Sequence, residues 1–155
     1  MNTKELGNLS PTNFDGRMGK QSTNWKSNPK LVGDEGENLA CEYLVKNGYK
    51  VLERNYRISF GEIDIIARKK RKLFSKVDKT IHFVEVKTIV SNKNFFPEER
   101  VDYKKQRKLK QLAEIWLEKN RFPQNYPYQI DIIGIVKDLY YNTTKLRYIP
   151  NAVEG

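Results

Sequence analysis

Three residues in apolar surroundings have side chains that suit chemistry on a phosphate group. Asp64 lies inside an apolar run at residues 63–67, and Glu85 and Lys87 lie inside a second apolar run at residues 81–89. A buried carboxylate without a partner is costly, so each acid needs a cation, a hydrogen-bond donor or a metal ion. The two runs therefore mark a candidate site.

The alternation of side chains along a strand predicts that these groups meet. Glu85 and Lys87 are two residues apart, so both project from the same face of a strand at 81–89. If this strand pairs with one at 61–68, Asp64 and Glu85 converge. Two converging carboxylates repel each other unless a cation lies between them, and Mg²⁺ is commonly held by one or two carboxylates, waters and phosphate oxygens. Such an ion can activate water for attack on a phosphate, while the lysine positions the water or stabilises charge.

A structural interpretation of the same residues stays open. Glu-x-Lys in a strand is commonly an ion pair, and Asp64 can form a salt bridge with Lys87 or Arg57. Glu37 occupies a capping-box-like position at a predicted helix start, and it can reach a metal if that helix start faces the sheet. Asp131 repeats the pattern of an aspartate among isoleucines, and there we favour a structural ion pair.

The composition indicates one basic globular domain. The chain has 155 residues, of which 38% are hydrophobic and 31% charged, and its formal net charge is +10. This length suits a single domain with one core. The excess of positive charge favours a polyanionic partner, which is nucleic acid or an anionic membrane surface.

Cysteine and histidine usage excludes two kinds of site. The single cysteine, Cys41, cannot form an intramolecular disulfide, and the single histidine, His82, excludes a Cys/His zinc cluster. We interpret Cys41 as a small core residue and His82 as a polar residue at a strand end. The chain has no apolar run long enough to span a bilayer, and its N-terminal segment lacks the apolar stretch of a signal peptide. We therefore expect a cytoplasmic protein with no membrane partner.

Hydrophobic periodicity predicts an α/β domain between two tails. Residues 1–32 have too little patterned apolar surface to offset chain entropy, so a disordered tail is expected there. The domain is predicted at 33–150, followed by a C-terminal tail at 151–155. Its expected elements are a helix at 34–47, strands at 49–57, 61–68 and 81–89, a helix at 98–120, and strands at 128–136 and 146–149. This order predicts a mixed sheet with helices on its faces.

Two groups of basic side chains are candidates for contact with a nucleic-acid backbone. The first belongs to the charged segment 69–80, which can equally be a solvated loop, and the second to the polar face of the 98–120 helix. The candidates are Lys69, Lys70, Arg71 and Lys72 in the first group and Lys104, Lys105 and Lys108 in the second. Trp116 lies on the apolar stripe of the same helix, which predicts a core side chain rather than a surface for stacking bases.

Several uncommon motifs follow one another along the chain. They are G-x-x-G-E-x-x-A-x-x-Y-L-x-x-x-G-Y at 33–49, L-x-R-N-Y-R at 52–57, G-E-I-D-I-I-A at 61–67, F-V-E-V-K-T at 83–88, K-Q-x-x-L at 105–109 and I-D-I-I at 130–133. This set resembles the YraN-type uncharacterised family. That family is similar to archaeal Holliday-junction resolvases and to the restriction-endonuclease-like superfamily. The resemblance covers residues 33–136.

The resemblance implies a restriction-endonuclease-like core, with a mixed central sheet flanked by helices, and an acid–acid–lysine site. Carried over to this sequence, Asp64 and Glu85 would be the ligands of Mg²⁺ or Mn²⁺ and Lys87 the catalytic lysine. Glu37 would be a helix-borne acid near the metal. The implied function is a metal-dependent endonuclease that hydrolyses DNA phosphodiesters, with branched DNA as a candidate substrate. A homodimer, common among resolvases, is left open.

The sequence departs from the family pattern in two places, and other functions compete. The segment 69–80 is longer than the family usually has, and Gln129-Ile130-Asp131 replaces an Arg-Phe-Asp strand motif. The main alternative is a non-catalytic nucleic-acid-binding module with a vestigial site, and a less favoured one is an assembly factor that uses its basic face for docking. The complete acid–acid–lysine set favours the enzyme, because a vestigial site has usually lost a member.

Overall fold

All seven predicted elements are present in the fold. A computed structural model describes residues 29–70, 78–90, 103–138 and 143–153. The elements are α1 (Pro29–Lys46), β1 (Tyr49–Ile58), β2 (Gly61–Lys69), β3 (Ile81–Val90), α2 (Tyr103–Lys119), β4 (Tyr128–Asp138) and β5 (Thr143–Ile149). The predicted α/β class is confirmed, and the arrangement is consistent with a restriction-endonuclease-like core. No helix in these ranges is both long enough and apolar enough to cross a membrane.

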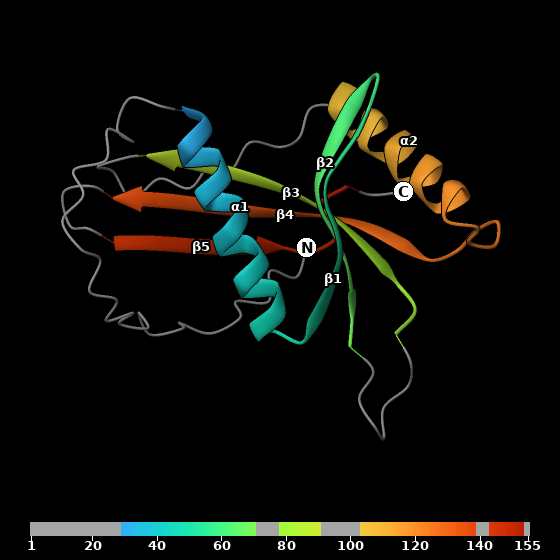
Figure 1. Cartoon of the computed structure of the whole chain (residues 1–155), viewed down its shortest axis with the longest axis horizontal. Helices are drawn as coiled ribbons and strands as arrows, with labels where there is room; N and C mark the ends of the chain where they lie inside the picture. The colour runs from blue at the N-terminus through green and yellow to red at the C-terminus, as the bar shows by residue number, and fades with distance from the viewer. Residues whose placement is uncertain (1–28, 71–77, 91–102, 139–142, 154–155) are drawn as a thin grey trace.

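The five strands form one mixed sheet in the order β1-β2-β3-β4-β5. β1 pairs with β2, β2 with β3 and β4 with β5 in antiparallel fashion, whereas β3 and β4 are parallel. Parallel neighbours need a crossover connection, and α2 lies in the connection between β3 and β4. Figure 1 shows the β1–β2 hairpin rising beside α2, away from the long strands β3 and β4.

The two helices cover opposite faces of the sheet. Phe83 of β3 packs in one buried cluster with α2 residues such as Leu112, whereas its neighbour Val84 packs in another with Ala40 and Leu44 of α1. Successive residues of a strand point to opposite faces, so the two clusters lie on opposite sides of β3. Glu85 and Lys87 share the parity of Phe83, and they therefore project toward the α2 side.

Helix α1 begins earlier than the sequence pattern predicts. It starts at Pro29, where the predicted start was residue 34. Proline suits a first helical turn because its missing N–H would have no partner there. Gly36 is buried, and a Cβ atom at this position would overlap with Oγ1 of Thr88 on β3. The absence of a side chain at Gly36 thus lets α1 approach the sheet beside the candidate site.

Some other predicted boundaries lie outside the residues that the structure describes. Residues 1–28 and 154–155 lie outside the described ranges, so the predicted tails stay predictions. Helix α2 is described from Tyr103, and the predicted helix start at 98 also lies outside. The fifth strand begins at Thr143, three residues before its predicted start at residue 146.

Trp116 is a core residue, as predicted from its place on the apolar stripe. Its side chain is 4% exposed, and its ring contacts Phe83 edge-on and stacks on Phe122, with centroids 5.6 Å away in both cases. The indole Nε1–H donates a hydrogen bond to Oε2 of Glu53 at 2.6 Å. The side chain therefore ties α2 to the sheet and to β1.

Trp116→Ala is expected to lower the free energy of unfolding by about 3–5 kcal/mol, because it removes a large buried ring and leaves a cavity. Urea denaturation measures this change. Ile115→Ala on the exposed side of the same helix is the matched control, with an expected loss below about 1 kcal/mol. Unchanged stability of Trp116→Ala together with weaker DNA binding would instead make the indole a stacking surface.

Candidate active site

Strands β2 and β3 separate beside Asp64. Their antiparallel ladder ends at the pair of Ile65 with Val84. One residue further along, Oδ2 of Asp64 accepts a hydrogen bond from the backbone N–H of Val86 at 2.7 Å. The carboxylate thereby satisfies a backbone donor at the point where strand pairing stops. Asp64 is tied to β3 by this bond rather than by the β2–β3 ladder, while its own strand stays paired with β1.

Acidic side chains from three elements influence one another here. Burial is the main cause that raises the pKa of Asp64 to about 7, and the negative charge of Glu85 on β3 adds to the rise. The hydrogen bond from Val86 acts in the opposite direction, and the charges of Glu37 on α1 and Glu62 raise the pKa further. The negative charge of Glu85 therefore acts on Asp64 where β2 and β3 separate. Such a cluster repels itself unless positive charge is nearby.

Two lysines supply positive charge on the α2 side. Nζ of Lys105, on α2, donates a hydrogen bond to Oε1 of Glu85, whose side chain is 10% exposed. Lys87 projects from β3 on the same face as Glu85, as the alternation of the strand requires. The sequence placed Lys105 among the nucleic-acid contacts and did not predict its pairing with Glu85.

Two further ion pairs lie around the cluster. Arg57, one of the ion-pair partners considered for Asp64, instead pairs with Glu62 at 2.8 Å between Nε and Oε2. Arg54, which the sequence did not single out, lies 3.9 Å from a carboxylate oxygen of Glu37. Glu37 therefore lies near Arg54, and its charge also acts on Asp64.

The donor set suits a magnesium-type ion with few protein ligands. Among the residues of the four described ranges, no three His, Cys, Asp or Glu side chains are gathered so that they could hold a metal by themselves. Asp64 and Glu85 are two carboxylates, and Mg²⁺ commonly takes one or two together with waters and phosphate oxygens. Burial is the largest cause of the raised pKa of Asp64 and the charge of Glu85 the second, and a cation between the two acids would offset both. The residues therefore fit such an ion, with Glu37 close by.

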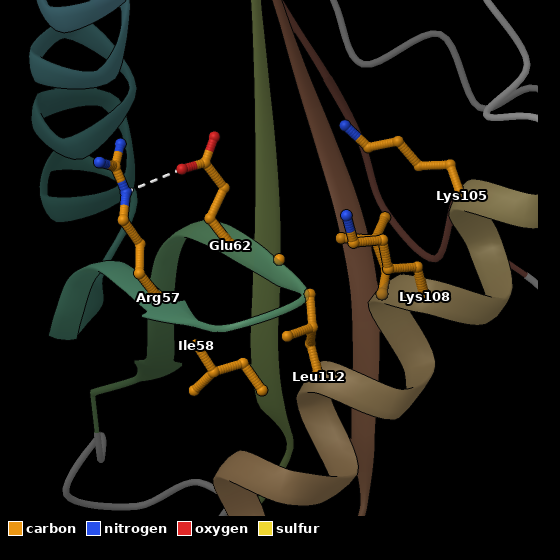
Figure 2. Close-up of a pocket in the computed structure, with 8 residues that line it drawn as sticks. Arg57, Ile58, Glu62, Lys105, Lys108 and Leu112 are labelled. Carbon is orange, nitrogen blue, oxygen red and sulfur yellow. Dashed lines mark ion pairs between the residues drawn. The ribbon is translucent and has the colours of Figure 1, made fainter.

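A pocket of about 320 Å³ opens next to the acidic cluster, between the β1–β2 hairpin and α2. Figure 2 shows the charged ends of its lining residues gathered on one side and apolar side chains on the other. The charged lining residues are Arg57, Glu62, Lys105 and Lys108, and the apolar ones include Ile58 and Leu112. Lys105 belongs both to this pocket and to the pair with Glu85.

The two predicted basic groups lie at different distances from Asp64: the first at the C-terminal end of β2 and the second on α2. Lys69 and Lys70 are exposed at its C-terminal end, where Lys69 is 3.9 Å from a carboxylate oxygen of Asp78. Five residues of strand separate Lys69 from Asp64, which is roughly 16 Å. Arg71 and Lys72 fall in a segment that the structure does not describe. Lys69 and Lys70, the described members of the first group, therefore lie away from the acidic cluster.

The second basic group borders the cluster directly. Lys105 contacts Glu85, Lys108 lines the adjacent pocket, and Lys104 is exposed one residue before Lys105 on α2. This separation allows a paired test of which group contacts DNA.

Replacing Lys104 and Lys108 together by glutamine is expected to flatten the dependence of log Kd on log[salt] by about 1.8, since each lost phosphate contact on duplex DNA is worth about 0.9. The matched control replaces Lys69 and Lys70 by glutamine and removes the same charge. Fluorescence anisotropy of labelled duplex at several salt concentrations measures both slopes. An equal or larger change in the control would place the backbone contacts at the other end of β2.

Asp131 is structural, as the sequence favoured, and its main partner is His82. The carboxylate is fully buried, and Oδ2 pairs with Nδ1 of His82 at 2.8 Å. Tyr148, Asn151 and Gln129 also donate hydrogen bonds to it, at 2.6, 2.8 and 2.7 Å. Burial acts to raise the pKa of Asp131, but the hydrogen bonds outweigh it and the pKa is lowered. His82 is thus a buried network partner and not merely a polar strand end, and Gln129 supplies the donor expected from an arginine.

Known protein sequences match most of this chain. Residues 36–135 match the sequence pattern of uncharacterised protein family UPF0102. A UPF0102 protein of Caldicellulosiruptor bescii is 44% identical over 125 residues, which is 81% of this chain and 98% of that protein. A UPF0102 protein of Thermodesulfovibrio yellowstonii is 42% identical over 121 residues, 78% of this chain and 94% of its own length. A third, from Campylobacter lari, is 39% identical over 108 residues, covering 70% and 86%.

Proposed function

Because this chain belongs to the uncharacterised protein family UPF0102, whose name assigns no activity, we propose its function from the site: a metal-dependent endonuclease that hydrolyses DNA phosphodiesters. The observation that carries the proposal is the influence of the Glu85 charge on Asp64 where β2 and β3 separate, with Lys87 on the same face of β3 as Glu85. We take branched DNA as the candidate substrate and the cytoplasm as the place of action.

Asp64 and Glu85 would hold Mg²⁺ or Mn²⁺, and Glu37 would support them from α1. A divalent ion bound there supplies Lewis-acid stabilisation of phosphate charge and makes water more acidic. The chain's own contribution is to fix the two acids. The N–H of Val86 orients Asp64, and Lys105 orients Glu85. Both orienting bonds come from the protein itself, so the acids are placed before substrate arrives.

Lys87 would act on the reacting phosphate. Its ammonium group shares a face of β3 with Glu85, so it lies on the side from which a phosphate approaches the acids. A fixed positive charge there stabilises the negative charge that develops on the phosphate oxygens during water attack, or it positions the attacking water. This role differs from that of Lys105, which is engaged with Glu85.

The basic character of α2 supports a DNA partner. The chain carries a net charge of +10, and the α2 residues Lys104, Lys105 and Lys108 lie beside the acids rather than across the molecule from them. A duplex or branched DNA lying along α2 would bring its backbone to the acidic cluster. Electrostatic contact of this kind provides affinity without sequence preference.

The direct test is a cleavage screen on duplex, flap, four-way and single-stranded DNA, with Mg²⁺ or Mn²⁺ compared with EDTA. We expect cleavage of at least one of these DNAs with metal and none in EDTA. Lys69→Met, at the far end of β2, serves as the lysine control and should cleave like the wild type. Metal-independent DNA binding without cleavage of any of the four DNAs would identify a non-catalytic binding module and overturn the proposal.

A further inference from the structure

The pocket beside the acidic cluster has a glycine at its base. Gly61 begins β2, and a Cβ atom there would lie 2.5 Å from Cε of Lys108 and 2.9 Å from Cδ1 of Leu112. A side chain at this position would push the ends of Lys108 and Leu112 aside, so the glycine leaves room for both beside the turn of the β1–β2 hairpin. The packing turns the aliphatic stem of Lys108 against the hairpin and leaves the space between Arg57 and Lys105 open (Figure 2).

The pocket is larger than a phosphate needs. Its volume is about 320 Å³. It falls at the lower end of the range for small-molecule sites, about 300–1,000 Å³. A phosphate group on the surface of a duplex would leave most of this space unfilled, so the size suits a whole nucleotide.

The two sides of the pocket differ in chemistry in the way that a nucleotide does. Three cationic side chains and one carboxylate stand on the charged side, which suits a phosphate next to a group that carries hydrogen-bond donors. On the other side stand Ile58, which is partly exposed, and Leu112, which is fully buried. Ile58 is therefore the side chain that offers an apolar contact to a base or a sugar (Figure 2). In a duplex the faces of the bases are stacked on one another and cannot reach such a surface.

From these features we infer that the pocket between the β1–β2 hairpin and α2 binds one unpaired nucleotide of the DNA, beside the phosphodiester that is cut. The inference rests on the proposed function for the position of the cut and names the substrate class as DNA with an unpaired nucleotide. Lys105 provides the link, since it lines the pocket and also donates to Glu85. A nucleotide held there places its neighbouring phosphate next to the acids.

Binding in EDTA separates this site from general backbone contact. The probes are a labelled single-stranded oligonucleotide, the same strand in a duplex, and a single strand of equal length made of abasic residues. Wild-type protein is expected to bind the base-containing single strand about tenfold more tightly than the abasic one, because contact with a base is worth about 1–3 kcal/mol. The charges of the two single strands are equal, so electrostatics cannot cause this difference.

Ile58→Ala is the pocket variant, because it removes apolar surface from the pocket without changing charge. It is expected to abolish the preference for bases while changing duplex affinity by less than about twofold. Lys108→Met is the contrasting variant, and it should weaken both single-stranded and duplex binding because it removes a charge. Thermal melts check that both variants fold.

Equal wild-type affinity for the base-containing and abasic strands would overturn the inference, whatever the variants do. Retention of the preference in a folded Ile58→Ala protein would also overturn it, by placing the base elsewhere. If the protein cleaves DNA but binds the base-containing and abasic strands equally, the nucleotide site is ruled out and the nuclease proposal stands. If it prefers the base-containing strand but cleaves nothing in the metal screen, the nuclease proposal is ruled out and the nucleotide site stands.

Discussion

Asp64→Asn is expected to stabilise the metal-free protein by about 2 kcal/mol at neutral pH while abolishing cleavage. Asparagine keeps the shape of the side chain and an oxygen that can accept the N–H of Val86. It removes the negative charge that faces Glu85 in a largely buried position. Loss of function with gain of stability is typical of a site in which like charges are held together for catalysis.

The size of the gain should depend on pH in a defined direction. The fold raises the pKa of Asp64 to about 7, whereas an unfolded aspartate titrates near about 3.9. Between these values the folded state holds a proton that the unfolded state has lost, so the charge of Asp64 lowers stability progressively as pH rises. The advantage of Asp64→Asn should therefore be absent near about pH 3.5, grow through the window and level off above about pH 7.

Asp131→Asn is the matched control, because it makes the same change at another buried aspartate with the opposite pKa shift. Hydrogen bonds from His82 and Tyr148 lower the pKa of Asp131, so its charge stabilises the fold at neutral pH. The substitution should cost about 3 kcal/mol or more there, because it disturbs a network of four donors. Urea unfolding of both variants across pH measures the contrast. A loss of about 3 kcal/mol or more in Asp64→Asn as well would identify Asp64 as a structural ion-pair member.

Lys87→Met is expected to reduce metal-dependent cleavage by about two to three orders of magnitude, if its ammonium stabilises charge in the transition state. Methionine keeps most of the aliphatic stem, so the packing of β3 is preserved while the positive charge is lost. Because the ammonium no longer opposes a cation at the neighbouring acids, metal binding should persist or tighten. Single-turnover cleavage rates with saturating protein measure the chemical step.

Two results would argue against this role for Lys87. Cleavage at close to the wild-type rate would take the lysine out of the chemistry. A large drop in melting temperature together with loss of the metal response would make it a structural partner of the acids. Lys69→Met controls for the general removal of a lysine, since Lys69 lies at the C-terminal end of β2, away from Asp64.

The alternation of side chains along the strands was enough to predict that Asp64 and Glu85 come close to each other. The segments around Asp64 and Glu85 are short apolar runs broken by charge, and period two assigns each side chain to a face of a strand. Two strands that follow one another in the sequence usually lie next to each other in a sheet. Convergence of the two acids then requires only that the register of the pairing bring Asp64 opposite Glu85. The order of strands and helices in turn follows from the hydrophobic periods of the seven segments.

Partners that are distant in sequence could not be predicted in the same way. His82 and Asp131 are 49 residues apart, and their contact depends on the parallel register of β3 and β4. The pairing of Lys105 with Glu85 depends on where α2 rests over the sheet, and a helical pattern assigns a lysine to a face without naming its partner. Several lysines on the polar face of α2 look equivalent in the sequence.

The start of α1 shows how a local signal can be overruled. Asp34 and Glu37 form a capping-box-like pattern that predicts a helix beginning at residue 34. The helix instead begins at Pro29, and Gly36 sits in its interior because a side chain there would collide with Thr88. Packing against β3 therefore accounts for a glycine that local propensity would place at a helix end.

The most direct test of the metal site is a set of thermal melts of wild type and Asp64→Asn, each in EDTA and in Mg²⁺. If Asp64 and Glu85 hold the ion, Mg²⁺ raises the melting temperature of the wild type and leaves that of Asp64→Asn unchanged. In EDTA the variant melts at or above the wild-type temperature. A strongly destabilised Asp64→Asn, with no response of the wild type to Mg²⁺, would contradict the account.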